Sequence, residues 1–138
     1  MNPLDSYRLV LAALCIWREA RNQSYSAMLG VAFVLYNRIT PTHDLIHVIT
    51  QRMQFSSMTA AGDTNLILWP QTGDAAFGAC CTAVETVLGG EEITVPDPTN
   101  GATFYYSPPL TAAPAAWGPT VVSAVIDQLT FCKPSSPT

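Results

Sequence analysis

Charged residues are scarce in this chain of 138 residues. They make up 12% of it, against roughly a quarter in an average globular domain. Only six residues are Lys or Arg, they are scattered, and the formal net charge is −4. A nucleic-acid or anionic-membrane surface needs a basic patch, so the composition argues against both partners. With 49% hydrophobic residues, the chain is long and apolar enough for one domain with a buried core.

Metal and cofactor motifs are also missing. No C-x-x-C pair, G-x-S-x-G, P-loop or Rossmann glycine pattern occurs, so we expect no metal and no cofactor. His43 and His47 have i, i+4 spacing, but no glutamate follows His43, and we predict that both are exposed. We expect buried free thiols at the cysteines, because two of them are adjacent and suit neither an ordinary disulfide nor a zinc knuckle. The cysteines are Cys15, Cys80, Cys81 and Cys132.

No apolar run is long enough to cross a membrane. The run at residues 9–17 has the length of a signal-peptide core, but Asp5 precedes it, Arg8 is the only cation there, and no A-x-A cleavage site follows. We therefore interpret this run as part of a core helix, and expect neither a signal peptide nor stable membrane insertion.

Helical periodicity and capping residues predict four helices in the first two thirds of the chain. Asn2 is predicted to cap the first, with Asp5 in its first turn and its end near Asn22. Ser24 or Ser26 caps the second. The expected ranges are about 3–22, 25–36, 44–51 and 75–88, the last capped by Asp74 and ended by a Gly-Gly pair.

The character of the sequence changes after residue 90. "VPDPTNGATFYYSPP" indicates a turn, a short strand and another turn, and "VVSAVIDQLTFCK" indicates one or two strands. Residues 134–138 are predicted to be a frayed tail. The predicted class is α+β: one domain over residues 1–133, mostly helical, with a small C-terminal sheet.

Glu19 is the most informative polar residue, because it lies in the last turn of an apolar helix. Its neighbours on the same face are Ala12, Cys15 and Ile16. Burial and the negative helix C-terminus would both raise its pKa, and a carboxyl that keeps its proton can protonate a glycosidic oxygen. The alternative is a structural ion pair with an arginine. The candidate partners are Arg8, Arg18, Arg21 and Arg38.

Several motifs together resemble the SleB-like cell-wall hydrolases, the family of spore-cortex-lytic enzymes and some phage endolysins. "IWREARNQSYSAMLGVAFVLYNRI" has the family's helix ending in Glu-Ala-Arg, followed by a helix ending in Asn-Arg. "QFS", at residues 54–56, resembles its Gln-Phe-Ser loop, and "DPTNGATFYYSP" resembles its Gly-Ala-x-x-Tyr segment. "IDQLTFCK" lies where the family has a final strand. The resemblance covers about residues 11–133.

The resemblance implies a lysozyme-like domain with a small antiparallel sheet that acts on peptidoglycan glycan strands, with Glu19 as the single catalytic acid. The residues expected to contact the sugar or orient Glu19 are Gln54, Phe55, Ser56, Tyr105 and Tyr106. By their composition alone, the aromatic residues at 104–106 suit strand packing as well as a sugar-stacking wall. We expect a monomer that accumulates in the cytoplasm and is released to the cell wall, as phage endolysins are.

This chain also departs from the family pattern. Asn22 and Gln23 replace a Gly-Glu pair, Ala27 and Met28 replace Gly-Gln, and Leu129 lies near the position of a frequent histidine. The loss of a glutamate at Gln23 bears on the mechanism of cleavage.

A two-carboxylate glycosidase needs a second acid about 5 Å or about 6.5–9.5 Å from the first. No residue near Glu19 in the sequence supplies it; Asp63, Asp74 and Asp97 could do so only through the fold. A lytic transglycosylase needs none, because the 6-hydroxyl of the sugar attacks the anomeric carbon. We therefore favour a lytic transglycosylase that cleaves the MurNAc-GlcNAc bond. A hydrolytic muramidase and a non-catalytic glycan-binding domain are the alternatives.

Overall fold

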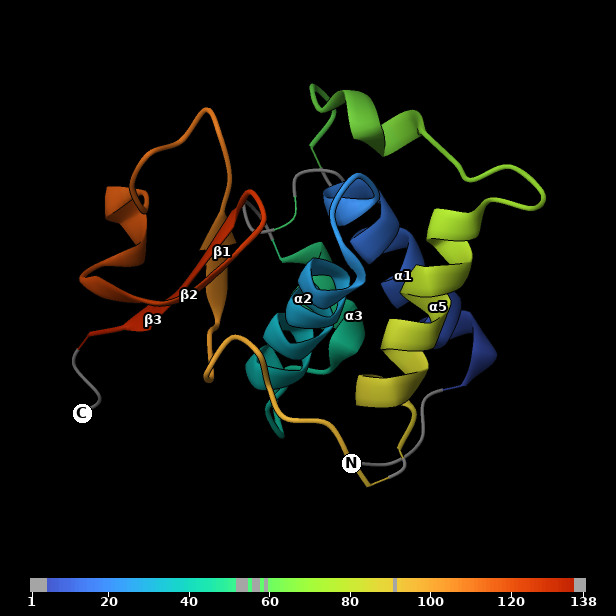
Figure 1. The fold of residues 1–138 in the computed structure, drawn as a ribbon, viewed down its shortest axis with the longest axis horizontal. Coiled ribbons are helices and arrows are strands. Elements are labelled where there is room, and N and C mark those ends of the chain that lie inside the picture. Colours follow the sequence, from blue (N-terminus) through green and yellow to red (C-terminus); the bar gives the residue numbers. More distant parts are fainter. Residues whose placement is uncertain (1–4, 52–54, 56–57, 59, 91, 136–138) are drawn as a thin grey trace.

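The computed structural model describes residues 5–51, 55, 58, 60–90 and 92–135. Among these residues, four α-helices lie on one side of the molecule and a three-stranded sheet on the other (Figure 1). The helices are α1 (Ser6–Ala20), α2 (Tyr25–Arg38), α3 (Leu45–Thr50) and α5 (Ala75–Leu88). The strands are β1 (Phe104–Tyr106), β2 (Thr120–Ile126) and β3 (Leu129–Pro134). Two 3-10 helices, η1 (Thr64–Ile67) and η2 (Ala115–Trp117), lie in the connections. The predicted α+β class is confirmed.

The helix starts follow local capping chemistry. The N-cap of α1 is Asp5, whose carboxylate accepts the Arg8 backbone N–H at 2.9 Å. The helix therefore begins later than predicted, because the Asp5 side chain satisfies the backbone N–H of Arg8 in its first turn; Asn2, the predicted cap, lies outside the described residues. Ser24 caps α2 through the N–H of Ala27, so of the two serines proposed it is the one that acts.

Two more aspartates cap the later helices. Asp44 begins α3 by accepting the N–H of His47, and Asp74 begins α5 by accepting the N–H of Phe77. The second helix runs to Arg38, two residues beyond the predicted end. The fourth predicted helix has the bounds expected from its cap.

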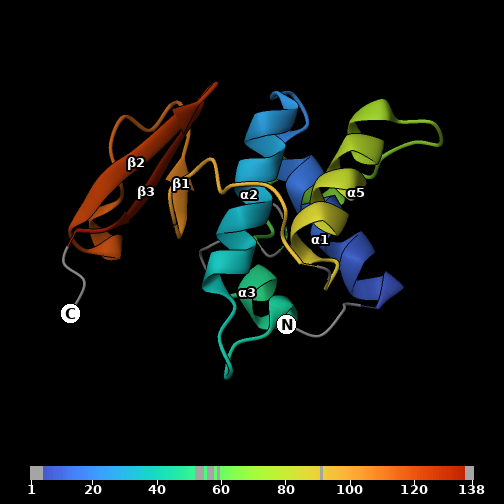
Figure 2. The ribbon, with the colours of Figure 1, turned by 60° about the horizontal axis from the view of Figure 1, so that its bottom comes forward.

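The helix α2 lies between the sheet and the pair α1 and α5 (Figures 1 and 2). The core is formed by the apolar faces of α1, α2, α3 and α5 and includes Phe131 of β3. Gly30 lies where α2 contacts the sheet: a Cβ atom there would lie 2.7 Å from Cζ of Phe131 and 3.2 Å from Cγ2 of Thr99. The absence of a side chain at Gly30 therefore lets the sheet pack directly on the helix.

The sheet is antiparallel with the order β1-β3-β2, so the second predicted strand region forms a hairpin of two strands. Tyr105 of β1 pairs with Phe131 of β3. A register shift between Val122 and Ala124 interrupts the pairing of β2 with β3. The predicted tail begins too early, because β3 extends through Pro134 and the N–H of the next residue donates to the carbonyl of Pro119.

The smaller predictions from composition are largely confirmed. Cys15, Cys80 and Cys132 are buried free thiols, and burial raises the pKa of Cys80 to about 12. The fourth, Cys81, is only partly buried. The rings of His43 and His47 are exposed and stack at 4.2 Å.

Two negative observations concern the described part of the chain. None of its helices combines the length and hydropathy that a membrane span requires. Among the same residues, no three His, Cys, Asp or Glu side chains gather in a way that would hold a metal ion.

Candidate active site

Glu19 lies in the last turn of α1 and is half-buried. The hydroxyl of Tyr105, which comes from β1, donates a hydrogen bond to Oε1 of Glu19. Burial raises the pKa of Tyr105 well above its usual range, and the negative charge of Glu19 raises it further. Tyr105 therefore keeps its proton near neutral pH, and its hydroxyl is always available to donate to the carboxylate.

The face of α1 beneath Glu19 is apolar, as its sequence predicts. Cys15, one turn earlier, is fully buried, and its pKa is raised well above the usual range by burial first and by the charge of Glu19 second. It is thus a neutral thiol. Ala12 and Ile16 are also fully buried. Glu19 therefore lies beside buried apolar side chains of α1 and accepts a hydrogen bond from the Tyr105 hydroxyl.

Aromatic packing fixes the position of Tyr105. Its ring centroid lies 6.3 Å from that of Phe55 and 5.8 Å from that of Phe131. Both phenylalanines are almost fully buried. A ring held between two buried rings has little rotational freedom, so its hydroxyl presents a fixed donor to Glu19.

The loop that leads into β1 is organised by Asp97. This carboxylate accepts the Nδ2 group of Asn37 at 3.0 Å, the N–H and hydroxyl of Thr99 at 2.8 and 2.6 Å, and the N–H of Gly101 at 3.0 Å. Asn37, from the end of α2, also donates to the carbonyl of Ala102 at 2.9 Å. Partial burial works to raise the pKa of Asp97, but these hydrogen bonds outweigh it and lower the pKa.

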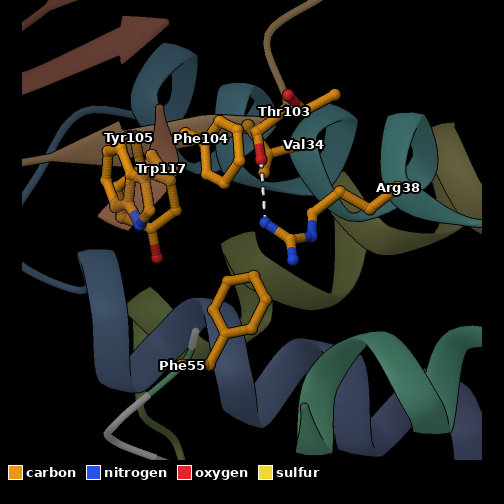
Figure 3. A pocket seen from close by; sticks show the side chains of 7 residues that line it. All are labelled: Val34, Arg38, Phe55, Thr103, Phe104, Tyr105 and Trp117. Atoms are coloured by element: carbon orange, nitrogen blue, oxygen red, sulfur yellow. Dashed lines mark hydrogen bonds between the residues drawn. The ribbon is translucent and has the colours of Figure 1, made fainter. Parts of the chain in front are cut away.

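Arg38 is the second contact from the end of α2 to this loop. Its Nη1 donates to the carbonyl of Thr103 at 3.0 Å and its Nη2 to Oε1 of Gln51 at 2.9 Å. The guanidinium also lies 5.3 Å from the ring centroid of Phe104 and 5.9 Å from that of Phe55. Figure 3 shows it pointing into a pocket between these rings. Burial lowers the pKa of Arg38.

Two arginines at the C-terminal end of α1, Arg18 in its last turn and the C-cap Arg21, contact the segment around η1. Arg18 is buried; its Nε donates to the carbonyl of Leu68 at 3.0 Å, and its guanidinium lies 4.9 Å from the ring of Trp69. Arg21 donates from Nη2 to Oδ1 of Asn65 at 2.9 Å. The end of α1 thus anchors the segment at η1, just as the end of α2 anchors the segment before β1.

Three of the predicted site residues form one contiguous group: Glu19, Tyr105 and Phe55. Tyr106 follows Tyr105 in a strand, so its side chain points to the opposite face of the sheet. Gln54 and Ser56 lie outside the described residues. The catalytic and sugar-binding roles of all six residues remain predictions.

The aspartates considered as a second acid each have a structural role. Asp63 and Asp74 cap η1 and α5, and Asp97 organises the loop described above. Arg8, one of the suggested ion-pair partners of Glu19, pairs with Asp5 at 2.6 Å at the opposite end of α1.

Sequence reasoning recognised the Asn-Arg ending of α2 only as a motif and did not assign it a contact. Asn37 and Arg38 hold a segment 60 to 65 residues further along the chain, which no local pattern shows. Trp117 was not singled out at all, yet it lines the pocket beside Tyr105.

Comparison with known proteins now identifies the family. Residues 22–132 match the family model Hydrolase_2, described as Cell Wall Hydrolase; Glu19 lies three residues before this segment. A search of curated protein sequences gave no match.

Two solved structures share the fold. One is the catalytic domain of the Bacillus cereus SleB protein, with a TM-score of 0.68, 23% identity, and coverage of 96% of this chain and 94% of that one. The other is the catalytic domain of the germination-specific lytic transglycosylase SleB from Bacillus anthracis, with a TM-score of 0.65, 23% identity, and coverage of 96% and 99%. The chain therefore belongs to the cell wall hydrolase family, and its fold is that of the SleB catalytic domains.

Proposed function

We propose that this protein cleaves the glycan strands of peptidoglycan as a lytic transglycosylase, at the MurNAc-GlcNAc bond, with Glu19 as both acid and base. The observation that carries the proposal is the pairing of Glu19 with the Tyr105 hydroxyl above an apolar helix face. The family match supports a cell-wall substrate, and the printed title of one structural relative names a lytic transglycosylase.

In the proposed reaction, the protonated Glu19 carboxyl donates its proton to the glycosidic oxygen as the bond to C1 of MurNAc breaks. The 6-hydroxyl oxygen of the same sugar then forms a bond to C1, and its proton passes to the Glu19 carboxylate. The products are a 1,6-anhydromuramic acid end and a GlcNAc end with a free 4-hydroxyl, and Glu19 regains its starting proton. No water is consumed.

Tyr105 has a positioning role in this scheme. It donates to one oxygen of Glu19, so the other oxygen has a defined direction for the proton transfers. The structural roles of the three aspartates also support a single-acid mechanism, because a carboxylate that accepts capping or loop hydrogen bonds is poorly placed to activate a water molecule.

Substitution of Glu19→Gln tests the catalytic role. We expect lysis of purified peptidoglycan to fall by about 10²–10⁴-fold while the thermal midpoint stays within a few degrees of wild type. The matched control is Glu85→Gln on the exposed face of α5, which should keep wild-type activity. A Glu19→Gln variant with half of wild-type lysis would show that Glu19 is not the acid.

Product analysis separates the mechanisms. Mass spectra of digested peptidoglycan should show fragments that end in 1,6-anhydromuramic acid, are lighter by one water than hydrolysis products, and resist borohydride reduction. Exclusively reducible fragments would instead establish a muramidase. Intact glycan strands after incubation with the folded protein, on several wall types, would favour a glycan-binding domain.

A further inference from the structure

His43 and His47 form a stacked pair in the connection from α2 to α3. Their ring centroids lie 4.2 Å apart with an interplanar angle of 22°, and both residues are exposed. Figure 2 shows the turn after α2 at the edge of the molecule, next to the start of α3. The pair has no part in the cleavage mechanism proposed above. Imidazole is the commonest metal ligand in proteins, so two adjacent exposed rings are a candidate metal site.

The backbone of His43 is fixed by a tight turn. Its N–H donates to the carbonyl and hydroxyl oxygens of Thr40 at 3.2 and 3.1 Å, and its carbonyl accepts the N–H of Thr40 at 3.0 Å. Three hydrogen bonds to one neighbour leave this backbone little freedom. The movement of His43 is therefore mainly rotation of its side chain.

His47 is held on the solvent side of α3. Its N–H donates to the cap residue Asp44 at 3.0 Å. Leu45, Val48 and Ile49 bury the opposite face of this helix. A helix with one face in the core cannot turn that face outward, so His47 remains beside His43. The fold thus presents both imidazoles from fixed backbone positions.

The ring nitrogens of the pair are accessible to a ligand. In the described part of the chain, the two rings stack on each other, and neither makes a hydrogen bond or an ion pair with another side chain. A metal ion that binds there would replace water molecules and would break no internal contact of these residues.

The spacing of the rings suits the chelation of one ion. A Zn–N bond is about 2.0–2.1 Å long, so a tetrahedral Zn²⁺ holds two imidazole nitrogens about 3.3 Å apart. Rings stacked at 4.2 Å need only small side-chain rotations to bring their nitrogens to this separation. Both side chains are exposed, so these rotations cost little packing.

The pair would supply an incomplete coordination shell. Among the described residues, no third His, Cys, Asp or Glu joins it in a metal-binding group. Asp44, between the two histidines, is engaged as the cap of α3. Water would complete the shell, as it does at the open position of catalytic zinc sites. The missing glutamate after His43 argues against a metalloprotease centre but not against this simpler site.

We propose that His43 and His47 form a two-histidine site for one divalent transition-metal ion, with water as the remaining ligands. Imidazole nitrogens favour Zn²⁺, Cu²⁺ and Ni²⁺ over Mg²⁺ and Ca²⁺. The bound ion links the turn after α2 to α3 and stabilises the folded chain, because it binds the native arrangement in preference to the unfolded one. The site is independent of the function proposed for Glu19.

Titration of the protein with Zn²⁺, followed by NMR through the ring C–H signals of histidine, tests the site. The chain has only two histidines, so both sets of ring signals report on this pair. The protein carries no polyhistidine tag. The solution is slightly alkaline and its buffer does not bind metals, because zinc binds the unprotonated ring nitrogen. Mg²⁺ at the same concentration is the metal control.

We expect both histidine signals to shift together, to saturate at a single Zn²⁺ per chain, and not to respond to Mg²⁺. The thermal midpoint should rise as Zn²⁺ is added. His43→Ala and His47→Ala should each weaken the Zn²⁺ affinity by about tenfold or more, because one ligand is lost. The control Cys81→Ser removes a partly buried thiol that could compete for zinc, and should leave the affinity unchanged.

Asp44→Asn separates the imidazoles from the carboxylate beside them. Asparagine caps a helix about as well as aspartate, so α3 keeps its start, and the affinity should fall by about threefold or less. A loss as large as in the histidine variants would make the carboxylate a ligand and overturn the two-histidine site. A shift of only one histidine, no shift at all, or an affinity that neither alanine variant reduces would overturn it as well.

Discussion

The helical half of the molecule and the sheet half differ in how they obtain their structure. Each helix in the first half begins at a residue that caps it locally, such as Asp5 for α1 and Asp74 for α5. The sheet has strands of only three to seven residues and packs against α2. Short strands are marginal in isolation, so the position of the sheet depends on the helix it contacts.

The contacts between the halves run along the whole length of α2. At its start, the N–H of Ser24 donates to Asp127 in the turn between β2 and β3 at 2.7 Å. In its middle, Gly30 allows Phe131 to pack directly on the helix. At its end, Asn37 binds Asp97. The helical half carries Glu19 and the sheet half carries Tyr105, so these contacts also determine whether the two meet.

The largest effect should come from emptying the middle of this interface. Phe131→Ala removes a fully buried ring that contacts Tyr105 and lies against Gly30. We expect a loss of about 3–5 kcal/mol in the free energy of unfolding, measured by urea denaturation. Val125→Ala, on the exposed side of β2, is the control and should change it little. Equal losses in the two variants would mean that the sheet is not stabilised through α2.

Removal of the Tyr105 hydroxyl should affect activity more than stability. Tyr105→Phe keeps the packed ring but loses the hydrogen bond to Glu19. A hydrogen bond to a charged group contributes about 1.5–3 kcal/mol, so we expect kcat to fall by roughly tenfold or more. Tyr7→Phe, at an exposed position near the start of α1, is the control and should retain wild-type kcat. A Tyr105→Phe enzyme with unchanged kcat would rule out the positioning role.

Loss of the Asp97 carboxylate should loosen the end of the interface next to β1. Asp97→Ala leaves several donors, among them Asn37 and the N–H of Thr99, without their acceptor. We expect a loss of about 1–3 kcal/mol in unfolding free energy together with reduced activity. Glu85→Ala on the exposed face of α5 should change neither. An Asp97→Ala variant as stable as wild type would contradict the proposed anchoring of the loop.

Acid should weaken the same interface, with a smaller effect. Hydrogen bonds from Ser24 lower the pKa of Asp127, and the loop hydrogen bonds lower that of Asp97. A lowered folded-state pKa gives stability that is present above the unfolded pKa, about 3.9, and is lost as the pH falls through the folded value. The thermal midpoint should thus drop below about pH 4, and less steeply in Asp97→Asn. Parallel curves for the two proteins would refute this.

These differences explain what the sequence could predict. The helices follow from caps and from periodicity, and so does the apolar face below Glu19. The errors in the predicted bounds have two causes. At the start of α1 the sequence offers two candidate caps, Asn2 and Asp5. At the end of β3 the strand continues through Pro134 because this residue pairs with Thr120 of β2. Long-range contacts such as Asn37 with Asp97 leave no local signature, and the resemblance to a family identified their motifs without their geometry.

The same limit applies to the candidate site. Glu19 stands out in the sequence because a carboxylate on the apolar face of a helix is unusual. Tyr105 was suggested only as part of a family motif. Its hydrogen bond to Glu19 joins residues 86 positions apart, and sequence alone does not bring them together. Trp117 follows a proline-rich connection and reaches the pocket only because η2 folds back onto Phe104.

The register shift in β2 has a consequence for the behaviour of concentrated solutions. This strand forms an open edge of the sheet and exposes Val121, Val122 and Val125, a combination that invites a second molecule to add its own strand. The shift between Val122 and Ala124 bends the strand and breaks the even spacing of its free N–H and C=O groups. We expect this register shift to reduce aggregation through the pairing of β2 strands from different molecules.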